Sequence, residues 1–466
     1  MRFDQQFVKD VLSDALIAYS AFPQEISFSI DTRTLQSGDI FVALTGAFTD
    51  GHSYLLQALE KNAGGFLMAL SKKSLLDTLD QKILKNKLVI LVPDPLQAFI
   101  QLAAAWRAQF TCPVVGITGS VGKTSTKEIL STILRLNNTP YCASQGNQNT
   151  RVGLAMNIFK MRPHHQVALF EMGISKRGEM AELARMVRPT TAVITGIGHA
   201  HMEGLGSLGD IALEKRDIFK YFTENSIGII NGDQPLLANV GYAFPMIKFG
   251  SKTINQIQAR KIHSSGSTIS FVLKVYKEKF PIILHNPHEG AVINSLASTA
   301  LAYLLQVPIS IILEGIKQPL RVSGRFEEKA LVDNKGKIIH DCYNANPESM
   351  KAALLAFQKI ETKAQKIAIL GDMLELGVNA PFWHRQLGRF LRKVPTLKHV
   401  ILVGDMVKWT YKTIPVGLTV DLVPTWQDAA KKLEEKLAQE SVVLVKGSRG
   451  VALEKLVQQF ANAPAV

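Results

Sequence analysis

Residues 112–130 read CPVVGITGSVGKTSTKEIL, and this stretch decides the fold class of the chain. The apolar run at 114–117 predicts a strand, a glycine-bearing turn follows, and the residues from 123 onward are typical of a helix. This order predicts a phosphate-binding loop, because glycine lets the backbone approach an anion and a helix start offers unpaired N–H groups. Lys123 would then supply a cation, and Thr124 would supply a hydroxyl for Mg²⁺.

The loop departs from the strict pattern at one position. That pattern places a glycine at 117, where this chain has Ile117, and Gly116 stands one place earlier. An ordinary glycine-rich strand-to-helix turn is the alternative interpretation. The Lys-Thr pair directly before a helical stretch favours the phosphate loop.

Composition sets broad limits on the kind of protein. At 466 residues the chain suggests about three domains of roughly 150 residues each. Its 47% hydrophobic and 20% charged residues indicate a globular protein. No segment is long and apolar enough to cross a bilayer, and the first residues, MRFDQQFVKD, lack the order of a signal peptide. We therefore expect a cytoplasmic protein without membrane insertion.

Charge and cysteine content exclude little more. The net charge of +14 suits nucleic acid, an acidic membrane surface or substrates with several phosphates, and composition does not choose among them. Lysine and arginine form no block of five or six residues, which weakens the nucleic-acid interpretation. The three cysteines have no CxxC spacing, so neither a disulfide framework nor a zinc site is indicated.

The alternation of apolar runs and helical stretches predicts an α/β protein with three domains. Residues 1–109 form a small α/β unit, 110–319 a mainly parallel sheet around the phosphate loop, and 320–466 a second doubly wound, Rossmann-like unit. A Pro/Gly/Arg segment at 318–325 predicts a linker. The expected strands lie at 39–44, 65–69, 88–92, 166–170, 191–195, 226–231, 337–341, 366–370, 399–403 and 441–445, and the expected helices at 95–110, 292–305, 347–359 and 426–440.

Carboxylates, histidines and a lysine follow the phosphate loop at strand ends. Glu171 ends the apolar run 167–170, where ligands bind in an open parallel sheet, and could ligate Mg²⁺. Motor ATPases usually place paired acids there, whereas this chain has Met172 in the second place. Further on, the glycine-rich loop 195–204 holds His199, His201 and a glutamate, a set dense in ligands and bases.

These strings together resemble the Mur ligases, which build the peptide stem of peptidoglycan. TGSVGKTS at 118–125, EMG at 171–173, HMEGLGSL at 201–208 and EKRDIF at 214–219 stand in the order of that family's central ATPase domain. DCYNANP at 341–347, GDMLELG at 371–377 and VKGSRG at 445–450 resemble the branch that adds D-alanyl-D-alanine to UDP-N-acetylmuramoyl-tripeptide. DTRTLQSGDIFVAL at 31–44 and GAFTDGH at 46–52 resemble its UDP-sugar domain.

The resemblance implies an ATP-dependent amide ligase. Such an enzyme phosphorylates the terminal carboxylate of the tripeptide to an acyl phosphate, which the amine of the dipeptide then attacks. Two Mg²⁺ ions are implied, and Lys215 matches the family's carbamylated lysine, whose anionic carbamate can ligate a cation where an ammonium cannot. The implied metal ligands are Thr124, Glu171, His201 and Lys215, and the implied catalytic residues are Lys123, His201, Lys215 and Arg325.

Nucleotide and substrate contacts are implied at further positions. The ATP site would comprise Gly119, Ser120, Gly122, Lys123, Thr124, Ser125, Asn294, Arg325 and Asp341. For the UDP sugar and the peptide substrates, the candidates are Asp31, Thr32, Arg33, Asn149, Thr150, Asn344, Asn346, Lys446, Ser448 and Arg449. Helix capping and turn formation are alternative roles for Asn294 and for the candidates from Asp31 to Thr150.

Three other functions remain open at this stage. A folylpolyglutamate synthetase shares the fold, although a histidine would be expected in its Asn-Pro motif. A basic nucleic-acid-binding ATPase and a catalytically silent relative are the others. We expect no nucleic-acid partner and a monomer, whereas the third residue of the tripeptide, lysine or diaminopimelate, is left open.

Overall fold

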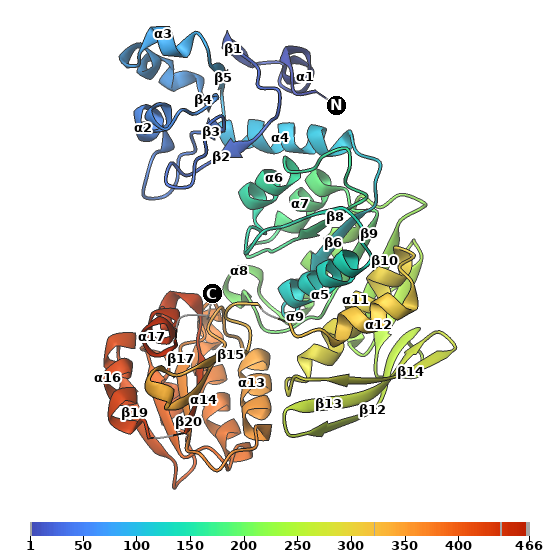
Figure 1. Cartoon of the computed structure of the whole chain (residues 1–466), viewed down its shortest axis with the longest axis vertical. Coiled ribbons are helices and arrows are strands. Elements are labelled where there is room, and N and C mark those ends of the chain that lie inside the picture. The colour runs from blue at the N-terminus through green and yellow to red at the C-terminus, as the bar shows by residue number, and fades with distance from the viewer. Residues whose placement is uncertain (1, 321, 439, 463–466) are drawn as a thin grey trace.

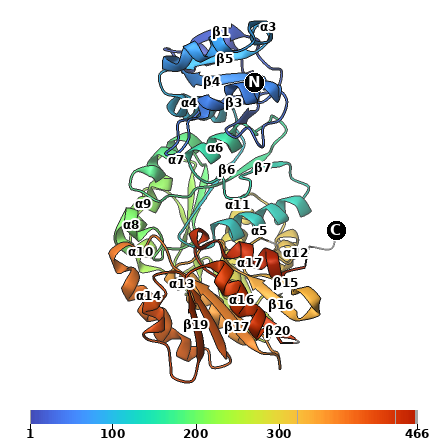
Figure 2. The same ribbon diagram turned by 90° about the vertical axis from the view of Figure 1, so that its left-hand side faces the viewer.

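The computed structural model describes residues 2–320, 322–438 and 440–462, in which the chain forms three β-sheets that follow one another in sequence. Figures 1 and 2 show the three parts stacked along the long axis of the molecule, with the amino-terminal part at the top and the carboxyl-terminal part at the bottom. The predicted three-part α/β architecture is confirmed. Arg321, in the expected linker, lies outside the described residues.

The amino-terminal sheet has five strands in the order β1-β5-β4-β3-β2, and all neighbours are parallel except β1 and β5. Strands β4 and β5 are buried along their whole length, as their uninterrupted apolar runs require. The elements are β1 (Leu16–Ser20), β2 (Phe28–Ser29), β3 (Ile40–Val42), β4 (Gly65–Ala69), β5 (Leu88–Val92), α1 (Gln5–Val11), α2 (Leu55–Glu60) and α3 (Gln81–Leu84).

Helix α4 (Pro95–Ala108) connects the first sheet to the second. Asp94 caps it by accepting from the N–H groups of Leu96 and Gln97, and Pro95 occupies its first turn. Figure 1 shows α4 between the amino-terminal sheet and helices α6 and α7, against which it packs. Since α4 contributes to both neighbouring cores, the expected boundary at 109/110 stays a prediction, as does the one at 319/320.

The central sheet has nine strands in the order β14-β13-β12-β11-β10-β9-β6-β8-β7. Strands β7 to β11, with β6 at the centre, are parallel, and β12 also pairs in parallel with β11. The elements are β6 (Val114–Thr118), β7 (Tyr141–Ala143), β8 (Val167–Glu171), β9 (Thr191–Ile194), β10 (Ile227–Asn231), β11 (Met246–Gly250), β12 (Ile257–Ser265), β13 (Thr268–Val275), β14 (Glu278–Leu284), α5 (Lys123–Leu136), α6 (Arg151–Ile158), α7 (Glu179–Val187), α8 (Met202–Leu205), α9 (Leu208–Arg216), α10 (Pro235–Ala238), α11 (Gly290–Leu304) and α12 (Ile309–Lys317).

The pleat of β6 sends alternate side chains into two different cores. Val115 and Ile117 pack with Ile129 and Ile133 of α5, whereas Val114 packs with the α4, α6 and α7 side. The phosphate-loop strand is thus covered on both faces. The loop that follows it is therefore held at the carboxyl edge of a rigid sheet.

The antiparallel meander β12-β13-β14 was not expected from the sequence. Burial in β13 alternates residue by residue, so its apolar side chains never form a continuous run. Pro281 lies in the edge strand β14, where a missing N–H costs little. In Figure 1 this meander lies beside the carboxyl-terminal part, and Lys359 of helix α13 binds Ser264 of β12 at 3.1 Å.

The carboxyl-terminal sheet has six strands in the order β15-β16-β20-β17-β18-β19, and only the β15–β16 pair is antiparallel. The elements are β15 (Glu327–Ala330), β16 (Gly336–His340), β17 (Lys366–Gly371), β18 (His399–Val403), β19 (Thr419–Val423), β20 (Ser441–Lys446), α13 (Pro347–Lys359), α14 (Ala380–Phe390), α15 (Lys408–Tyr411), α16 (Trp426–Lys436) and α17 (Leu453–Phe460). Helix α16 ends before the expected residue 440, because Leu437 adopts an extended conformation.

Within the described ranges, no helix combines the length and the apolar character that crossing a bilayer requires. The three cysteines are free, and Cys142 and Cys342 are buried. Burial raises the pKa of Cys142 to about 11 and that of Cys342 to about 12. Neither buried thiol is therefore ionised near neutral pH.

Candidate active site

The predicted phosphate loop joins β6 to α5. Gly119 (φ 152°) and Gly122 (φ 86°) both adopt backbone conformations that L side chains rarely reach. A Cβ atom on Gly119 would lie 2.0 Å from Thr195 Oγ1, and one on Gly122 would lie 2.4 Å from Asn294 Oδ1. Both positions therefore require glycine, whereas Ile117, at the displaced position of the motif, is a fully buried strand residue.

Lys123 opens helix α5 and reaches back over the loop. Its Nζ donates to the carbonyl of Gly119 at 2.8 Å. Removal from water lowers the pKa of Lys123, Glu171 acts to raise it, and Arg325 acts to lower it. Two charged groups that the sequence assigned to the same site thus influence this lysine, and one of them, Arg325, belongs to the carboxyl-terminal part of the chain.

A cavity of about 380 Å³ lies in front of the phosphate loop and is lined by all three parts of the chain. Helix α4 provides Leu96, the central part provides Lys123 and Glu171, and the carboxyl-terminal part provides Arg325 and Tyr343. Further lining residues with predicted roles are Ser120, Asn149, Thr150, His201, Asn344 and Asn346. Residues that are far apart in sequence therefore share one chamber.

Glu171 lies at the end of β8 and is only 1% exposed. Its Oε1 accepts from Asn149 Nδ2 at 2.9 Å. Its Oε2 is buried and has no hydrogen-bond partner among the described residues. A buried carboxylate oxygen without a partner is costly, which points to a ligand that is bound during function.

The histidine loop, residues 195–204, lies between β9 and α8 and contacts the carboxyl-terminal part through its two histidines. His201 has a left-handed backbone (φ 58°), which is uncommon for a residue other than glycine, and its Nδ1 lies 2.5 Å from Glu375 Oε2. The close approach of His201 lowers the pKa of Glu375. His199 does not line the cavity; it pairs with Glu348 of α13, and its ring centroid lies 4.1 Å from that of Trp383.

Lys215 lies on α9 and is 1% exposed. Burial lowers its pKa well below the ordinary value, and Lys123 lowers it further while Glu214 acts to raise it. No hydrogen bond or ion pair to Lys215 Nζ is formed within the described part of the chain. Lys215 and Thr124 do not line the cavity.

Two of the carboxyl-terminal candidates, Asp341 and Lys446, form contacts within or beside the segment DCYNANP at 341–347. Asp341 Oδ1 accepts from the N–H of Phe326 at 3.2 Å, and Oδ2 pairs with Lys446 Nζ at 2.9 Å. Lys446 also donates to the carbonyl of Asn344 at 3.1 Å, and Ser448 Oγ accepts from the N–H of Leu374 at 2.9 Å. The polar atoms of Lys446 and Ser448 are thus used within the protein, and their expected substrate contacts stay a prediction.

Asn344 and Asn346, in the segment 341–347, both line the cavity and form hydrogen bonds with backbone N–H groups. Asn346 caps α13 by accepting from Ser349 N–H at 2.8 Å, and Asn344 Oδ1 accepts from Ala345 N–H at 2.8 Å. Asn294 lies against the phosphate loop at Gly122. Ser125 follows Thr124 in the first turn of α5.

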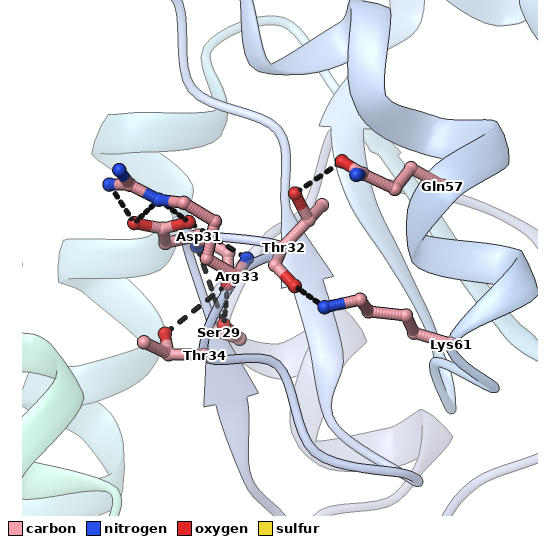
Figure 3. A network of polar contacts seen from close by, with 7 residues as sticks. All are labelled: Ser29, Asp31, Thr32, Arg33, Thr34, Gln57 and Lys61. Carbon is pink, nitrogen blue, oxygen red and sulfur yellow. Dashed lines mark hydrogen bonds and ion pairs between the residues drawn. The ribbon is translucent and has the colours of Figure 1, made fainter.

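The amino-terminal candidates lie in a separate polar network, which Figure 3 shows. Thr32 is buried, its hydroxyl donates to Gln57 at 2.5 Å, and its carbonyl accepts from Lys61 at 2.8 Å. Asp31 is engaged by Arg33 at 2.6 Å, whereas the Arg33 side chain is 86% exposed. None of the three predicted residues lines the cavity. Their contact with a UDP sugar stays a prediction, for which Arg33 is the accessible group.

Several cavity residues escaped the sequence analysis. Tyr343 was quoted within its string but given no role; the Arg325 guanidinium lies 4.1 Å from its ring centroid and that of Arg449 lies 6.0 Å away. Glu375, which holds His201, was also within a quoted string. Arg151 directly follows the capping residue Thr150 and carried no motif signal.

Comparison with known proteins agrees with this geometry. Residues 117–302 match the Mur ligase middle domain, and residues 324–449 match the Mur ligase glutamate ligase domain. The chain is 32% identical to the UDP-N-acetylmuramoyl-tripeptide–D-alanyl-D-alanine ligase of Bacillus subtilis, with 93% of each chain covered. It is also 32% identical to the Escherichia coli enzyme of that name, with 92% of each covered.

Solved structures show the same relationship. MurF from Acinetobacter baumannii matches with a TM-score of 0.83 at 26% identity over 98% of both chains. The MurF ligase from Thermotoga maritima in complex with ADP matches with a TM-score of 0.77 at 27% identity, covering 93% of this chain and 96% of that one. The chain belongs to the Mur ligase family, in the group of the UDP-N-acetylmuramoyl-tripeptide–D-alanyl-D-alanine ligases.

Proposed function

We propose that this protein joins D-alanyl-D-alanine to UDP-N-acetylmuramoyl-tripeptide at the expense of ATP, giving the pentapeptide precursor of peptidoglycan, ADP and phosphate. The observation that carries this function is the single cavity that brings together the phosphate loop, helix α4 and Arg325. A ligase of this kind needs one chamber where a nucleotide and two further substrates meet. The relatives at 32% identity support the choice of substrates.

ATP is assigned to the phosphate-loop side of the cavity. Lys123 would hold the β- and γ-phosphates, with Gly119, Ser120, Gly122, Thr124 and Ser125 supplying the loop and the helix start. Asn294 would contact the adenine and Asp341 the ribose. The ADP complex of the Thermotoga maritima neighbour supports a nucleotide at this fold position.

The reaction then proceeds in two steps. An oxygen of the tripeptide carboxylate attacks the γ-phosphorus, the bond from that phosphorus to the β-phosphate oxygen breaks, and ADP leaves. The amine of the dipeptide next attacks the acyl carbon, the carbon–oxygen bond to phosphate breaks, and the nitrogen loses a proton. Lys123 and Arg325 supply positive charge where the phosphoryl group develops negative charge, and the cavity walls align the reactants.

The residues present fit the magnesium ions that the family implies. Glu171 offers a buried carboxylate oxygen without a partner, and His201 keeps its Nε2 available because Nδ1 faces Glu375. A carboxylate on the other ring nitrogen is the arrangement that orients metal-bound histidines. Thr124 and a carbamate on Lys215 would complete the set, and bound Mg²⁺ would neutralise phosphate charge.

No group of three or more His, Cys, Asp or Glu side chains that could hold a metal occurs in residues 2–320, 322–438 and 440–462. The proposed set has only two members of those types, Glu171 and His201. Carbamylation needs a neutral amine, and burial of Lys215 favours that form. The lysine thus fits the proposed modification.

The remaining assignments complete the proposal. The amino-terminal part, residues 1–109, binds the UDP sugar, 110–319 bind ATP, and 320–466 bring the dipeptide through Asn344, Asn346, Lys446, Ser448 and Arg449. Because Arg325 and Lys123 come from different parts, binding and release require these parts to move. We further propose a cytoplasmic monomer.

An assay of ATP turnover tests the function. Release of ADP and phosphate is expected to depend on both UDP-N-acetylmuramoyl-tripeptide and D-alanyl-D-alanine, with pentapeptide formed in equal amount. ATP turnover indifferent to the two substrates would refute it. Parallel reactions with folate plus glutamate, and with DNA or RNA, address the two other classes, and neither addition is expected to stimulate turnover.

A further inference from the structure

One end of the cavity has no role in phosphoryl transfer. It is formed by the first turns of α6 and α7 and by α4, and it carries Arg151 and Glu179 beside an apolar wall of Leu96, Val152 and Leu183. Two opposite charges next to an apolar wall suit a ligand with a hydrocarbon stem and a charged end.

Arg151 is held in place but keeps free donors. Its Nη1 donates to Glu182 Oε2 at 3.0 Å, and the arginine side chain is 38% exposed. Its Nε and Nη2 donate to no group in the described ranges. A guanidinium presents five N–H donors in a planar fork, so the remaining edge is ready for a carboxylate.

Glu179 offers the complementary group. Its Oε2 accepts from the N–H groups of Ser175 at 2.7 Å and Lys176 at 3.0 Å, and Oε1 has no such donor in the described chain. Glu179 and Glu182 are three residues apart on α7 and share a face of that helix. Because Arg151 pairs with Glu182, the free edge of Arg151 and the free oxygen of Glu179 lie at the same end of the cavity.

The chemistry of the substrate identifies what occupies this end. The carboxylate that is phosphorylated must lie near Lys123 and Arg325, and it belongs to the third residue of the tripeptide. The side chain of that residue is therefore the part of the substrate that reaches the cavity walls. Lysine would bring an ammonium alone and leave the free edge of Arg151, opposite its contact with Glu182, without a carboxylate, whereas diaminopimelate ends in both an ammonium and a carboxylate.

We propose that Arg151 and Glu179 form a subsite for the zwitterionic end of a diaminopimelate side chain, with the carboxylate on Arg151 and the ammonium on Glu179. This inference rests on the proposed function. It makes Arg151 the residue that distinguishes diaminopimelate from lysine in the third position, because only the former has a distal carboxylate.

The test compares kcat/KM for the diaminopimelate and lysine forms of UDP-N-acetylmuramoyl-tripeptide. The wild type is expected to prefer the diaminopimelate form by at least about tenfold, and R151Q to lose about 10–100-fold on that form while changing little on the lysine form. R151K should recover little, because an ammonium lacks the planar fork. E179Q should weaken both forms, since both carry an ammonium. R185Q, at an exposed arginine on α7, is the matched control.

Equal loss on both substrates in R151Q would overturn the proposal, since the arginine would then bind a carboxylate common to both, such as that of the D-glutamyl residue. Wild-type preference for the lysine form would also overturn it while leaving the ligase function intact. If the wild type used neither form of the tripeptide, the result would instead contradict the proposed function. If thermal unfolding shows that R151Q is poorly folded, the substrate preference of the wild type and the effect of E179Q on the two forms still test the proposal.

Discussion

Lys446 Nζ lies 2.9 Å from Asp341 Oδ2, and the two side chains are only 2% and 10% exposed. Lys446 also donates to the carbonyls of Asp341 and Asn344. The ion pair thus joins the end of β20 to the string that follows β16. This buried pair holds in place the backbone segment that carries Tyr343 and Asn344, which line the cavity.

Replacing Lys446 with methionine is expected to destabilise the protein by about 3–5 kcal/mol, because the Asp341 carboxylate would stay buried without a positively charged partner. Urea unfolding measures the loss. The double variant D341N/K446M leaves neither charge and should recover much of the stability. A K446M midpoint equal to that of the wild type would show that the pair contributes nothing to folding.

Tyr343 is expected to hold Arg325 over the cavity through its ring. The guanidinium lies 4.1 Å from the ring centroid, so removing the ring in Y343L should cost about 0.5–2 kcal/mol of cation–π attraction. That corresponds to a fall of roughly 2–30-fold in kcat/KM for ATP. Y343F keeps the ring and should stay near the wild type. Y411L, at an exposed tyrosine on α15, is the control.

An equal effect of Y343F and Y343L would contradict this role. It would assign the effect to the hydroxyl, whose pKa is raised by burial, with Arg325 acting to lower it. Steady-state kinetics with ATP varied at saturating peptide substrates separates the two outcomes.

Much of the fold could be predicted because the parallel strands are continuous apolar runs that end in glycine or polar residues, as in β6 and β8. What escaped prediction had no such run. Strand β13 alternates buried and partly exposed residues, and β2 has two residues, so neither stands out from its surroundings. The meander is half-buried, which is why its pattern differs from that of the central strands.

The residues of the candidate site that could be predicted also differ from those that could not in whether a local sequence pattern marks them. Lys123, Glu171 and Arg325 were predicted and share the cavity, because local strings place them at a helix start, at a strand end and at the end of the linker, respectively. Glu375 meets His201 only through the packing of the carboxyl-terminal part on the central part, and no local pattern records that contact. Thr32 shows the opposite case, since a residue chosen as a ligand uses its hydroxyl on Gln57.

Lys215 is expected to carry a carbamate. K215A should be nearly inactive and should recover part of its activity in added acetate or formate, which can replace the missing carboxylate. A second measurement does not depend on activity: wild-type protein equilibrated with ¹³C-bicarbonate should show a carbamate carbon by NMR that is absent in K215A. K220A, at an exposed lysine beyond α9, serves as the matched control. Full activity of K215A, or no wild-type signal, would refute the modification.

Asp233 is expected to make the histidine loop sensitive to acid. Burial acts to raise the pKa of Asp233, but hydrogen bonds from the N–H groups of Ser251 and Lys252 and from the side chains of Ser251 and Asn255 outweigh it and lower the pKa. The next residue, Gln234, binds Ile197 N–H at 2.7 Å and the Ile197 carbonyl at 3.1 Å. The carboxylate thus fixes the turn that holds the loop of His201.

Since the folded state lowers this pKa, the stabilisation is fully present above the unfolded value of about 4 and is lost as the pH falls through the lower folded value. Because Asp233 is partly exposed and solvent screens its interactions, D233N should lose only about 0.5–1 kcal/mol of stability at pH 7. The difference from the wild type should shrink below about pH 4. D77N, at an exposed aspartate, is the control. Urea unfolding across pH 3–7 measures the trend, and a D233N deficit that stays constant over that range would contradict the assignment to the ionised carboxylate.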